Sequence, residues 1–506
     1  MKNKKYFLGL LLAGITVTGC GSKDSSSSKN NESKIVTVSL GSKPKSLDPT
    51  MYNEIPSLSI VKQIYNTLFK IDLNGNIVPE LAESFEYVTP TELVIKLKKG
   101  VKFHNGEELK ASDVVFSIKR MTEKPATKVM LDVVQSVEAD GEYGVIIKLK
   151  EPSAPLLFTL SYPLTAILNE KYILEKGNNI GTDAMGTGAF KYANWGDGEK
   201  IQLVANENYF GDKAKIDELI FRAIPENTSR LAALETGEID ITTVAPIDVQ
   251  TVESNNELYA VSFPTTSTEY LTLNMNREPF NNKEFRKALH HAIDKQSIVD
   301  AVYLGKASVA NTIVNPTVFG SDQTIGKTDY DPEKAKEYLE KSGVKNRTIK
   351  IMSNDNLVRL QAAQIVQANL KEIGINAEIE TVEWGTYLQM TAQGDYDIFI
   401  GGWVAGTSDA DIVLFPLLHS SYKGGAGNRA NFDNKDYDKL VELGRTSTEP
   451  SERLKAYSEA QTILEEESPL IPLYYKNENM GLNKRITNFE AMPNLIHDYS
   501  IIEIKD

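Results

Sequence analysis

The chain of 506 residues has a single cysteine, Cys20, and only five histidines. One cysteine excludes an intramolecular disulfide framework and any zinc or iron–sulfur centre that requires several cysteines. Basic residues are outnumbered, with 55 Lys and Arg against 69 Asp and Glu, and the net charge of −14 argues against a nucleic-acid partner. Hydrophobic residues make up 41% of the chain, which is enough apolar material for two or three globular lobes.

The motifs of common enzymes are incomplete. Residues 326–328 end like a phosphate-binding loop, but the preceding Gly320 stands one position too early. Residues 406–410 lack the second glycine of a serine-hydrolase elbow. His290 and His291 are adjacent, so on a helix they point apart and are interpreted as structural residues. The sequence therefore predicts no catalytic residues, no metal and no cofactor.

The N-terminus has the pattern of a secretion signal. Three lysines at positions 2, 4 and 5 precede a short apolar run over residues 6–17. Gly19 directly before Cys20 is typical of a bacterial lipobox, in which the thiol takes a diacylglyceryl group and becomes the mature N-terminus. The alternative is a signal peptide with a buried, inert cysteine. We expect residues 1–20 to be a lipoprotein signal and the serine-rich residues 21–34 to be a tether.

Hydrophobic periodicity predicts an α/β body. From Thr348 the pattern is strand, helix, strand, helix, strand, and it ends in a buried strand over residues 397–400. Ligands in such sheets bind beyond the carboxyl ends of strands. Residues 93–150 instead favour short strands around a helix over residues 112–120, which predicts a smaller mixed lobe.

Several short segments occur in a fixed order along the body. They are SLDP (46–49), IYNTLF (64–69), NGNIVPELAES (74–84), GVKFHNG (100–106), ASDVVF (111–116), GTGAF (186–190), GEID (237–240), FRKAL (285–289) and IPLYY (471–475). Together they resemble the peptide and nickel class of solute-binding proteins of ABC transporters. The resemblance extends from about residue 35 to the C-terminus, and Cys20 fits the lipid-anchored form found in Gram-positive bacteria.

The resemblance implies a periplasmic-binding-protein-like type II fold with three lobes. Two α/β lobes close on the ligand by a hinge motion, and a smaller lobe is inserted. The implied boundaries are 35–65, 190–271 and 480–506 for lobe I, 66–189 for lobe II and 272–479 for lobe III.

The resemblance also implies a set of ligand-binding residues. Trp384 and Trp403 match pocket aromatics of relatives, although large aromatics of this kind are also common core residues. Residues Asn53, Glu54 and Ile55 match a segment that runs along the ligand backbone, and Tyr270 matches a cleft aromatic.

Two charged anchors of dipeptide-binding relatives are replaced. Gly406 stands where an aspartate pairs with the ligand amine, and Ser353 stands where an arginine takes the ligand carboxylate. Asp409 is a candidate substitute for the amine anchor, but with Asp411 it is also suited to holding its own loop. We therefore expect simple dipeptides to bind poorly.

The expected function is a monomeric, lipid-anchored receptor on the extracellular face of the cell membrane. It would capture oligopeptides or N-blocked peptides for the permease and ATPase subunits of an ABC importer. The alternatives are a receptor for a metallophore, a nickel complex or an oligosaccharide, and a surface peptide sensor or chaperone without transport. A secreted hydrolase is the least favoured, because no catalytic set is visible.

Overall fold

The computed structural model describes residues 33–73, 75–196, 199–345, 347–424 and 427–505. The expected signal segment, Cys20 and residues 21–32 of the expected tether lie outside the described residues. Residues from Lys34 onward form one compact unit.

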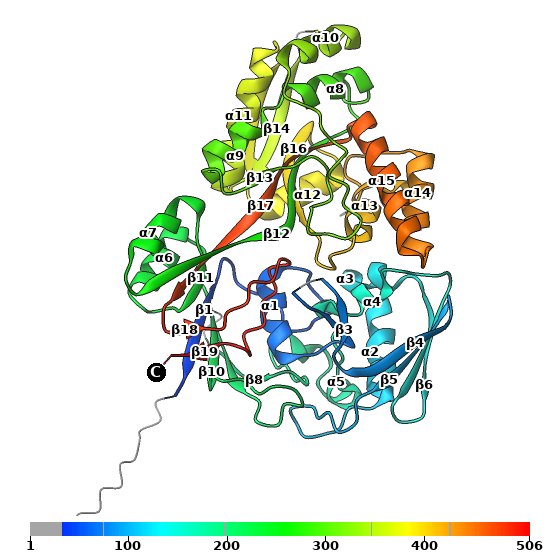
Figure 1. Ribbon diagram of the computed structural model, residues 1–506, viewed down its shortest axis with the longest axis vertical. Coiled ribbons are helices and arrows are strands. Elements are labelled where there is room, and N and C mark those ends of the chain that lie inside the picture. Colours follow the sequence, from blue (N-terminus) through cyan, green and yellow to red (C-terminus); the bar gives the residue numbers. More distant parts are fainter. Residues whose placement is uncertain (1–32, 74, 197–198, 346, 425–426, 506) are drawn as a thin grey trace, which may run out of the picture. The chain divides into compact units, whose positions relative to one another are not determined.

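A large mixed sheet organises this unit (Figure 1). Within the described residues it has eleven strands, in the order β15 (Asn376–Val382), β14 (Thr348–Asn354), β16 (Ile398–Val404), β12 (Leu258–Leu273), β17 (Leu470–Asn483), β11 (Ile241–Thr243), β1 (Ile35–Leu40), β10 (Glu218–Ala223), β9 (Lys200–Ala205) and β8 (Phe190–Gly196), with β13 (Ser308–Val309) paired to β17.

The long antiparallel pair β12 and β17 links the two halves of this sheet (Figure 1). Residues 258–264 of β12 pair with residues 477–483, next to β11, whereas residues 268–272 pair with residues 470–475, next to β16. The register shifts between Pro264 and Thr268. A bulge of this kind bends a strand and increases its local twist, so the strand pair changes direction between the two halves.

The predicted β–α–β–α–β unit is confirmed. β14 is followed by α11 (Leu357–Glu372), β15, α12 (Trp384–Gln393) and β16, and β14 pairs in parallel with both β15 and β16. The apolar stripe of α11 lies in the core because Ala363, Val366 and Leu370 are fully buried. β16 runs directly into the segment where the sequence predicts a ligand.

Three further predicted helices are present, namely α8 (Lys283–Ala292), α10 (Pro332–Ser342) and α15 (Pro450–Glu467). As expected, Asp331 caps α10 by accepting a hydrogen bond from the Lys334 amide, and Gly343 ends the helix at φ 70°. The same half of the molecule contains α9 (Lys295–Tyr303), α13 (Asp411–Leu418) and α14 (Lys435–Thr446).

A separate antiparallel sheet confirms the predicted strands in residues 93–150. Its order is β4 (Ala82–Thr89), β5 (Glu92–Leu97), β7 (Gly144–Leu149), β6 (Val134–Asp140), and α2 (Ala111–Glu123) packs against β6 and β7. His104 ties two of the quoted segments together, since its Nε2 lies 3.0 Å from the Gly188 carbonyl and its Nδ1 accepts the Gly186 amide. The boundaries of the three lobes remain a prediction.

The remaining elements are short. They are α1 (Ile55–Ile64), α3 (Pro125–Lys128), α4 (Leu156–Thr159), α5 (Glu170–Lys176), α6 (Asn227–Glu235), α7 (Val249–Ser254), the strands β2 (Phe69–Ile71), β3 (Ile77–Pro79), β18 (Ile486–Thr487) and β19 (Glu503–Ile504), and the 3-10 turns η1 (Val129–Leu131), η2 (Pro163–Thr165), η3 (Gly177–Gly181), η4 (Pro246–Asp248) and η5 (Ser420–Tyr422).

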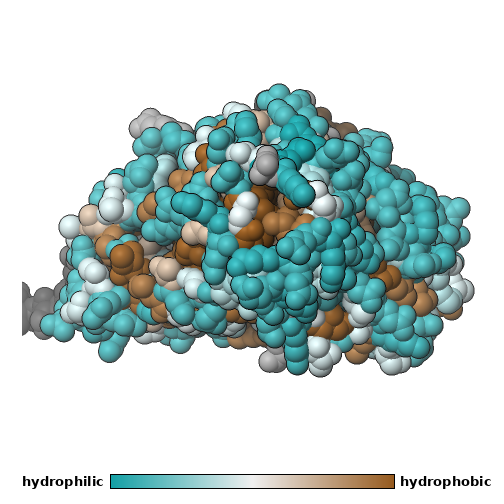
Figure 2. Space-filling view, turned by 90° about the horizontal axis from the view of Figure 1, so that it is seen from above, coloured by the Kyte–Doolittle hydropathy of each residue, from teal (hydrophilic) through white to brown (hydrophobic). Residues whose placement is uncertain are grey.

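Hydrophilic side chains cover most of the face in Figure 2, and hydrophobic residues form separate smaller patches there. Among the described residues, none of the helices combines the length and the apolar character needed to cross a membrane.

Candidate functional site

A cavity of about 550 Å³ lies beside the carboxyl end of β16, within the size range of ligand pockets. Its walls come from the segment before α1, from β12, β16, α11 and α12, and from the chain after α13. The lining residues are Asn53, Glu54, Ile55, Tyr162, Tyr270, Thr272, Arg359, Trp384, Tyr387, Leu388, Phe399, Gly401, Gly402, Trp403, Val404, Leu417, Gly427, Arg429, Ala430 and Leu470.

The structure brings six of the sequence-predicted site residues to this one cavity. Asn53, Glu54 and Ile55 come from the start of α1 and the residues before it, and Tyr270, Trp384 and Trp403 come from β12, α12 and β16. Gly406 and Asp409 are not among the lining residues, and neither is Ser353, which is fully buried in β14.

Aromatic side chains form much of the cavity lining. Trp384 is 46% exposed and stacks on Tyr387, with ring centroids 5.3 Å apart and planes at 14°. The Trp403 indole Nε1 donates a hydrogen bond to the Ile412 carbonyl at 2.9 Å, and the residue is half-buried. Both tryptophans therefore present ring surface to the cavity, which suits stacking and apolar contact with a ligand.

Two of the charged groups at the cavity are engaged in bonds within the protein. Glu54 caps α1 by accepting a hydrogen bond from the Ser57 amide at 3.0 Å. Arg359 makes a bidentate ion pair with Glu269, with Nε to Oε2 at 2.9 Å and Nη2 to Oε1 at 3.0 Å. Despite burial, the pKa of Arg359 is raised because Glu269 lies beside it. Gly402 permits this pair, because a Cβ there would overlap the Glu269 carboxylate.

In contrast to Glu54 and Arg359, the Arg429 side chain is unpaired. Its guanidinium has no hydrogen bond or ion pair within the described residues. Its Nε is buried and unbonded, and the guanidinium lies over the Phe399 ring at 6.0 Å from the centroid. Arg429 also lines a neighbouring polar pocket of about 300 Å³, together with Asn274, Arg277 and Asn431. The main cavity and the polar pocket therefore meet at an unpaired cation.

Gly406 packs against Tyr162, which explains why no side chain stands at the expected amine-anchor position. A Cβ on Gly406 would lie 2.6 Å from Tyr162 Cε2 and 2.9 Å from both Cζ and the hydroxyl oxygen. The Tyr162 hydroxyl donates to Asn53 Oδ1 at 2.8 Å, so the ring is held in place. The space of a side chain at position 406 is thus filled by the Tyr162 ring.

Asp409 lies away from the cavity as a partner of Arg453. It is fully buried, and its carboxylate oxygens lie 2.7 and 2.9 Å from Arg453 Nη2. Burial raises the pKa of Asp409, and the Arg453 charge opposes that shift. Asp411 likewise accepts from Arg445 at 2.9 Å. Both aspartates therefore hold their own loop to nearby helices.

Sequence reasoning did not identify the other lining residues of the cavity, among them Tyr162, Arg359, Tyr387 and Arg429. Tyr387 could have been found, because it follows Trp384 by three positions on a predicted helix and such residues share a face. Arg429 follows three glycines at positions 424, 425 and 427, and no periodic or motif pattern there indicates a binding residue.

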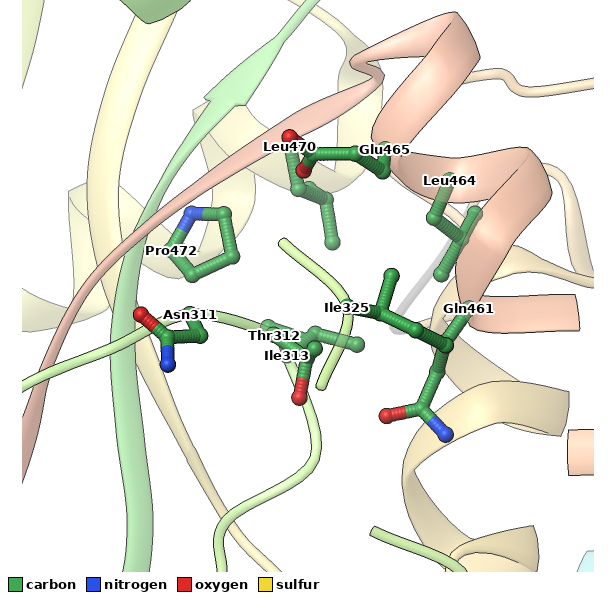
Figure 3. Close-up of a pocket in the computed structure, with 9 residues that line it drawn as sticks. All are labelled: Asn311, Thr312, Ile313, Ile325, Gln461, Leu464, Glu465, Leu470 and Pro472. Carbon is green, nitrogen blue, oxygen red and sulfur yellow. The ribbon is translucent and has the colours of Figure 1, made fainter. Parts of the chain in front are cut away.

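A second hollow, shown in Figure 3, is too small for a ligand. Its volume is about 20 Å³, which is room for about one water molecule. Apolar side chains such as Ile325, Leu464 and Leu470 lie around it, beside the start of β17 and α15. The main cavity is therefore the better candidate for ligand binding.

A large cavity lined by aromatic side chains in an α/β fold is typical of a ligand-binding protein. The chain belongs to the bacterial extracellular solute-binding proteins, family 5, whose middle-region model matches residues 76–425. The predicted family and its periplasmic-binding-protein-like fold are thus confirmed, and the relatives are solute-binding proteins and not enzymes.

Three similar proteins illustrate the family. Di/tripeptide-binding protein 1 of Pseudomonas aeruginosa is 29% identical, over 91% of this chain and 92% of that protein. Heme-binding protein A of Haemophilus influenzae is 30% identical, over 85% of each chain. The ABC transporter-associated periplasmic binding protein DppA of Helicobacter pylori, solved with the peptide STSA, has a TM-score of 0.84 at 27% identity, covering 93% of this chain and 98% of that chain.

Proposed function

We propose that this protein is the receptor of an ABC importer that captures peptides and delivers them to a membrane permease and its ATPase. The observation that carries the proposal is the 550 Å³ cavity, which is lined by aromatic side chains such as Trp384 and Trp403 and by the segment Asn53 to Ile55. A peptide offers apolar side chains to aromatic residues and backbone groups to polar ones. Two relatives with peptides in their names or titles support the ligand class.

The transport step follows from the long strand pair. β12 and β17 connect the halves of the large sheet, and their register shifts between Pro264 and Thr268. We infer that this segment is the hinge, because a few residues at a strand irregularity can absorb the change in backbone angles. Closure then brings the Tyr162 and Gly406 segments together over the ligand. The permease recognises this closed conformation.

The ligand should lack a free amine near position 406. Burying an ammonium without a partner costs several kcal/mol, and Tyr162 rather than a carboxylate occupies that place. The test is calorimetry on ligand-stripped protein with Ala-Ala, its N-acetyl form and peptides of five to nine residues. We expect the longer and N-acetylated peptides to bind more tightly. Micromolar binding of free Ala-Ala alone would contradict the ligand class proposed here.

A non-peptide solute is the second candidate. The replaced dipeptide anchors and the relative named for heme binding favour it, and a metallophore, nickel complex or oligosaccharide would fit the same cavity. Mass spectrometry of the compound that copurifies with the protein separates the two candidates. A surface sensor or chaperone without transport would bind peptides equally well, so uptake of a labelled peptide with and without the permease tests that alternative.

We further propose that Cys20 anchors the protein to the outer face of the cell membrane as a lipoprotein and that the protein acts as a monomer. The lipobox-like Gly19-Cys20 pair supports the anchor. Loss of the acyl chains removes the strong attachment, so Cys20→Ser should release the protein into the medium. Unchanged membrane fractionation of this variant would reject the anchor, and light scattering measures the oligomeric state.

A further inference from the structure

The unpaired guanidinium of Arg429 distinguishes it from the other arginine of the main cavity. Arg359 is neutralised by a bidentate contact with Glu269. Arg429 has no acceptor within the described part of the chain, and its Nε is shielded from solvent. A buried guanidinium Nε without a hydrogen-bond partner is unfavourable, so a ligand that supplies an anion gains from pairing with it.

The base of the Arg429 side chain is fixed by its neighbours. The Arg429 carbonyl accepts hydrogen bonds from the Tyr396 hydroxyl and, at 3.1 Å, from Asn431 Nδ2. The next carbonyl, that of Ala430, accepts the Met275 amide at 3.0 Å. Phe399 lies under the guanidinium, which orients the flat group without consuming its donors. The residue is therefore held for binding at low entropic cost.

The surroundings of Arg429 are polar on one side and aromatic on the other. The polar pocket that shares Arg429 is lined by the amide side chains of Asn274, Asn276, Gln393 and Asn431. The second arginine there, Arg277, is already bonded to Asp395 at 2.9 Å and to Asp397 at 3.4 Å. A ligand that reaches from the aromatic wall towards the amides passes Arg429.

We propose that Arg429 binds a carboxylate of the ligand where the main cavity meets the polar pocket. A carboxylate is planar and matches the parallel donors of a guanidinium, and such charge-assisted bonds are the stronger kind. The ligand class is thus an organic acid, and under the proposed function a peptide acid. This inference rests on that function and adds the position of the charged group. The carboxylate comes from either the peptide C-terminus or an acidic side chain.

Calorimetry with matched peptides tests the proposal. Pentapeptides ending in a free acid or an amide, each with an internal Glu or Gln, are titrated into ligand-stripped wild-type protein. We expect the acid form to bind about ten- to hundredfold more tightly than its neutral counterpart. A preference for acid over amide identifies the C-terminus, and a preference for Glu over Gln identifies a side chain. In Arg429→Met the preference should vanish, and in Arg429→Lys part of it should remain.

Arg277→Met is the matched control, because that arginine borders the polar pocket but already has carboxylate partners. It should retain the preference for the acid. Arg429→Met should melt near the wild-type temperature, since Arg429 makes no bond that its loss would break. Equal binding of acid and neutral peptides, or a preference that survives in Arg429→Met, would overturn the inference while leaving peptide binding intact.

If no peptide in the panel binds, the proposed function fails. A second experiment then still tests whether Arg429 binds a carboxylate. The compound that copurifies with wild-type protein and with Arg429→Met is then identified by mass spectrometry, and small mono- and dicarboxylic acids are titrated. An acid that binds wild-type protein and is lost in Arg429→Met supports the inference. A neutral or cationic ligand, or the absence of an acid whose binding depends on Arg429, refutes it.

Discussion

Gly406→Ala should weaken ligand binding without weakening the fold. Gly406 does not adopt a left-handed backbone conformation, so alanine is allowed at that position as far as the backbone is concerned. The added Cβ would meet Tyr162 at 2.6 to 2.9 Å, where ordinary contacts begin at about 3.4 Å. Tyr162 lies in the segment before η2, and Gly406 follows β16. Tyr162 lines the cavity and Gly406 follows the lining residue Val404 by two positions, so the overlap falls beside the cavity.

The size of the effect follows from the cost of overpacking. Inserting a methyl group into a filled contact costs about 1–3 kcal/mol, which corresponds to an affinity about 5- to 150-fold weaker. The Tyr162 ring cannot move away freely, because its hydroxyl is bonded to Asn53 and its ring packs beside Leu58, Leu164 and Ile496. If the hinge opens, the ligand-free protein avoids the overlap, so its melting temperature should change little.

The assay is isothermal calorimetry with one bound peptide, combined with thermal melting of the ligand-free protein. Gly41→Ala is the control, since the nearest atom to its Cβ would be an arginine nitrogen at an ordinary 3.8 Å. In the double variant with Tyr162→Ala, the penalty of Gly406→Ala should disappear. Wild-type affinity in Gly406→Ala, or a penalty that persists without the Tyr162 ring, would refute the reasoning.

Trp403→Ala should weaken ligand binding by about 1–3 kcal/mol through lost stacking and apolar contact, whereas native affinity with a collapsed melting temperature would make it a core residue. Asp409→Asn should lower the free energy of unfolding by about 3–5 kcal/mol in urea titration, because it leaves Arg453 buried without its counter-ion, and should leave peptide affinity unchanged. Burial lowers the pKa of His497 to about 4. The unfolded state takes up this proton near pH 6.5, so the contribution of His497 to stability should fall by about 3 kcal/mol between pH 6.5 and 4, and His497→Gln should show a correspondingly flatter pH dependence in urea.

The local parts of the fold were predictable because each rests on short-range periodicity. The stripe Ala363, Val366 and Leu370 recurs at helical spacing, and the structure buries it. Sheet order is a different matter. β1 pairs in parallel with β10, about 180 residues away, and β12 pairs with β17 across a shifted register. No periodic pattern in either strand encodes its partner, so only the family resemblance indicated how the two halves connect.

The candidate site likewise contains residues that the sequence predicted and residues that only the structure reveals. Six positions that the resemblance indicated line the cavity, and three of them, Tyr270, Trp384 and Trp403, are aromatic. Arg429 could not be found, because what sets it apart is the absence of a partner among the described residues, which is visible only in three dimensions. For Asp409 the sequence suggested a role in binding that the structure does not support. Its carboxylate, although near the expected anchor in sequence, is paired with Arg453 on a helix more than forty residues away.

Gly406 and Arg429 together define an asymmetric cavity. The expected amine-anchor position has no carboxylate and is filled by the Tyr162 ring, whereas Arg429, which lines the cavity, has no counter-ion among the described residues. A free dipeptide has its two charges close together, so satisfying Arg429 with its carboxylate would carry its ammonium into the aromatic part of the cavity. A longer peptide or an N-blocked acid separates or removes that second charge. The same two residues that disfavour dipeptides therefore favour an acid whose other end is neutral or distant.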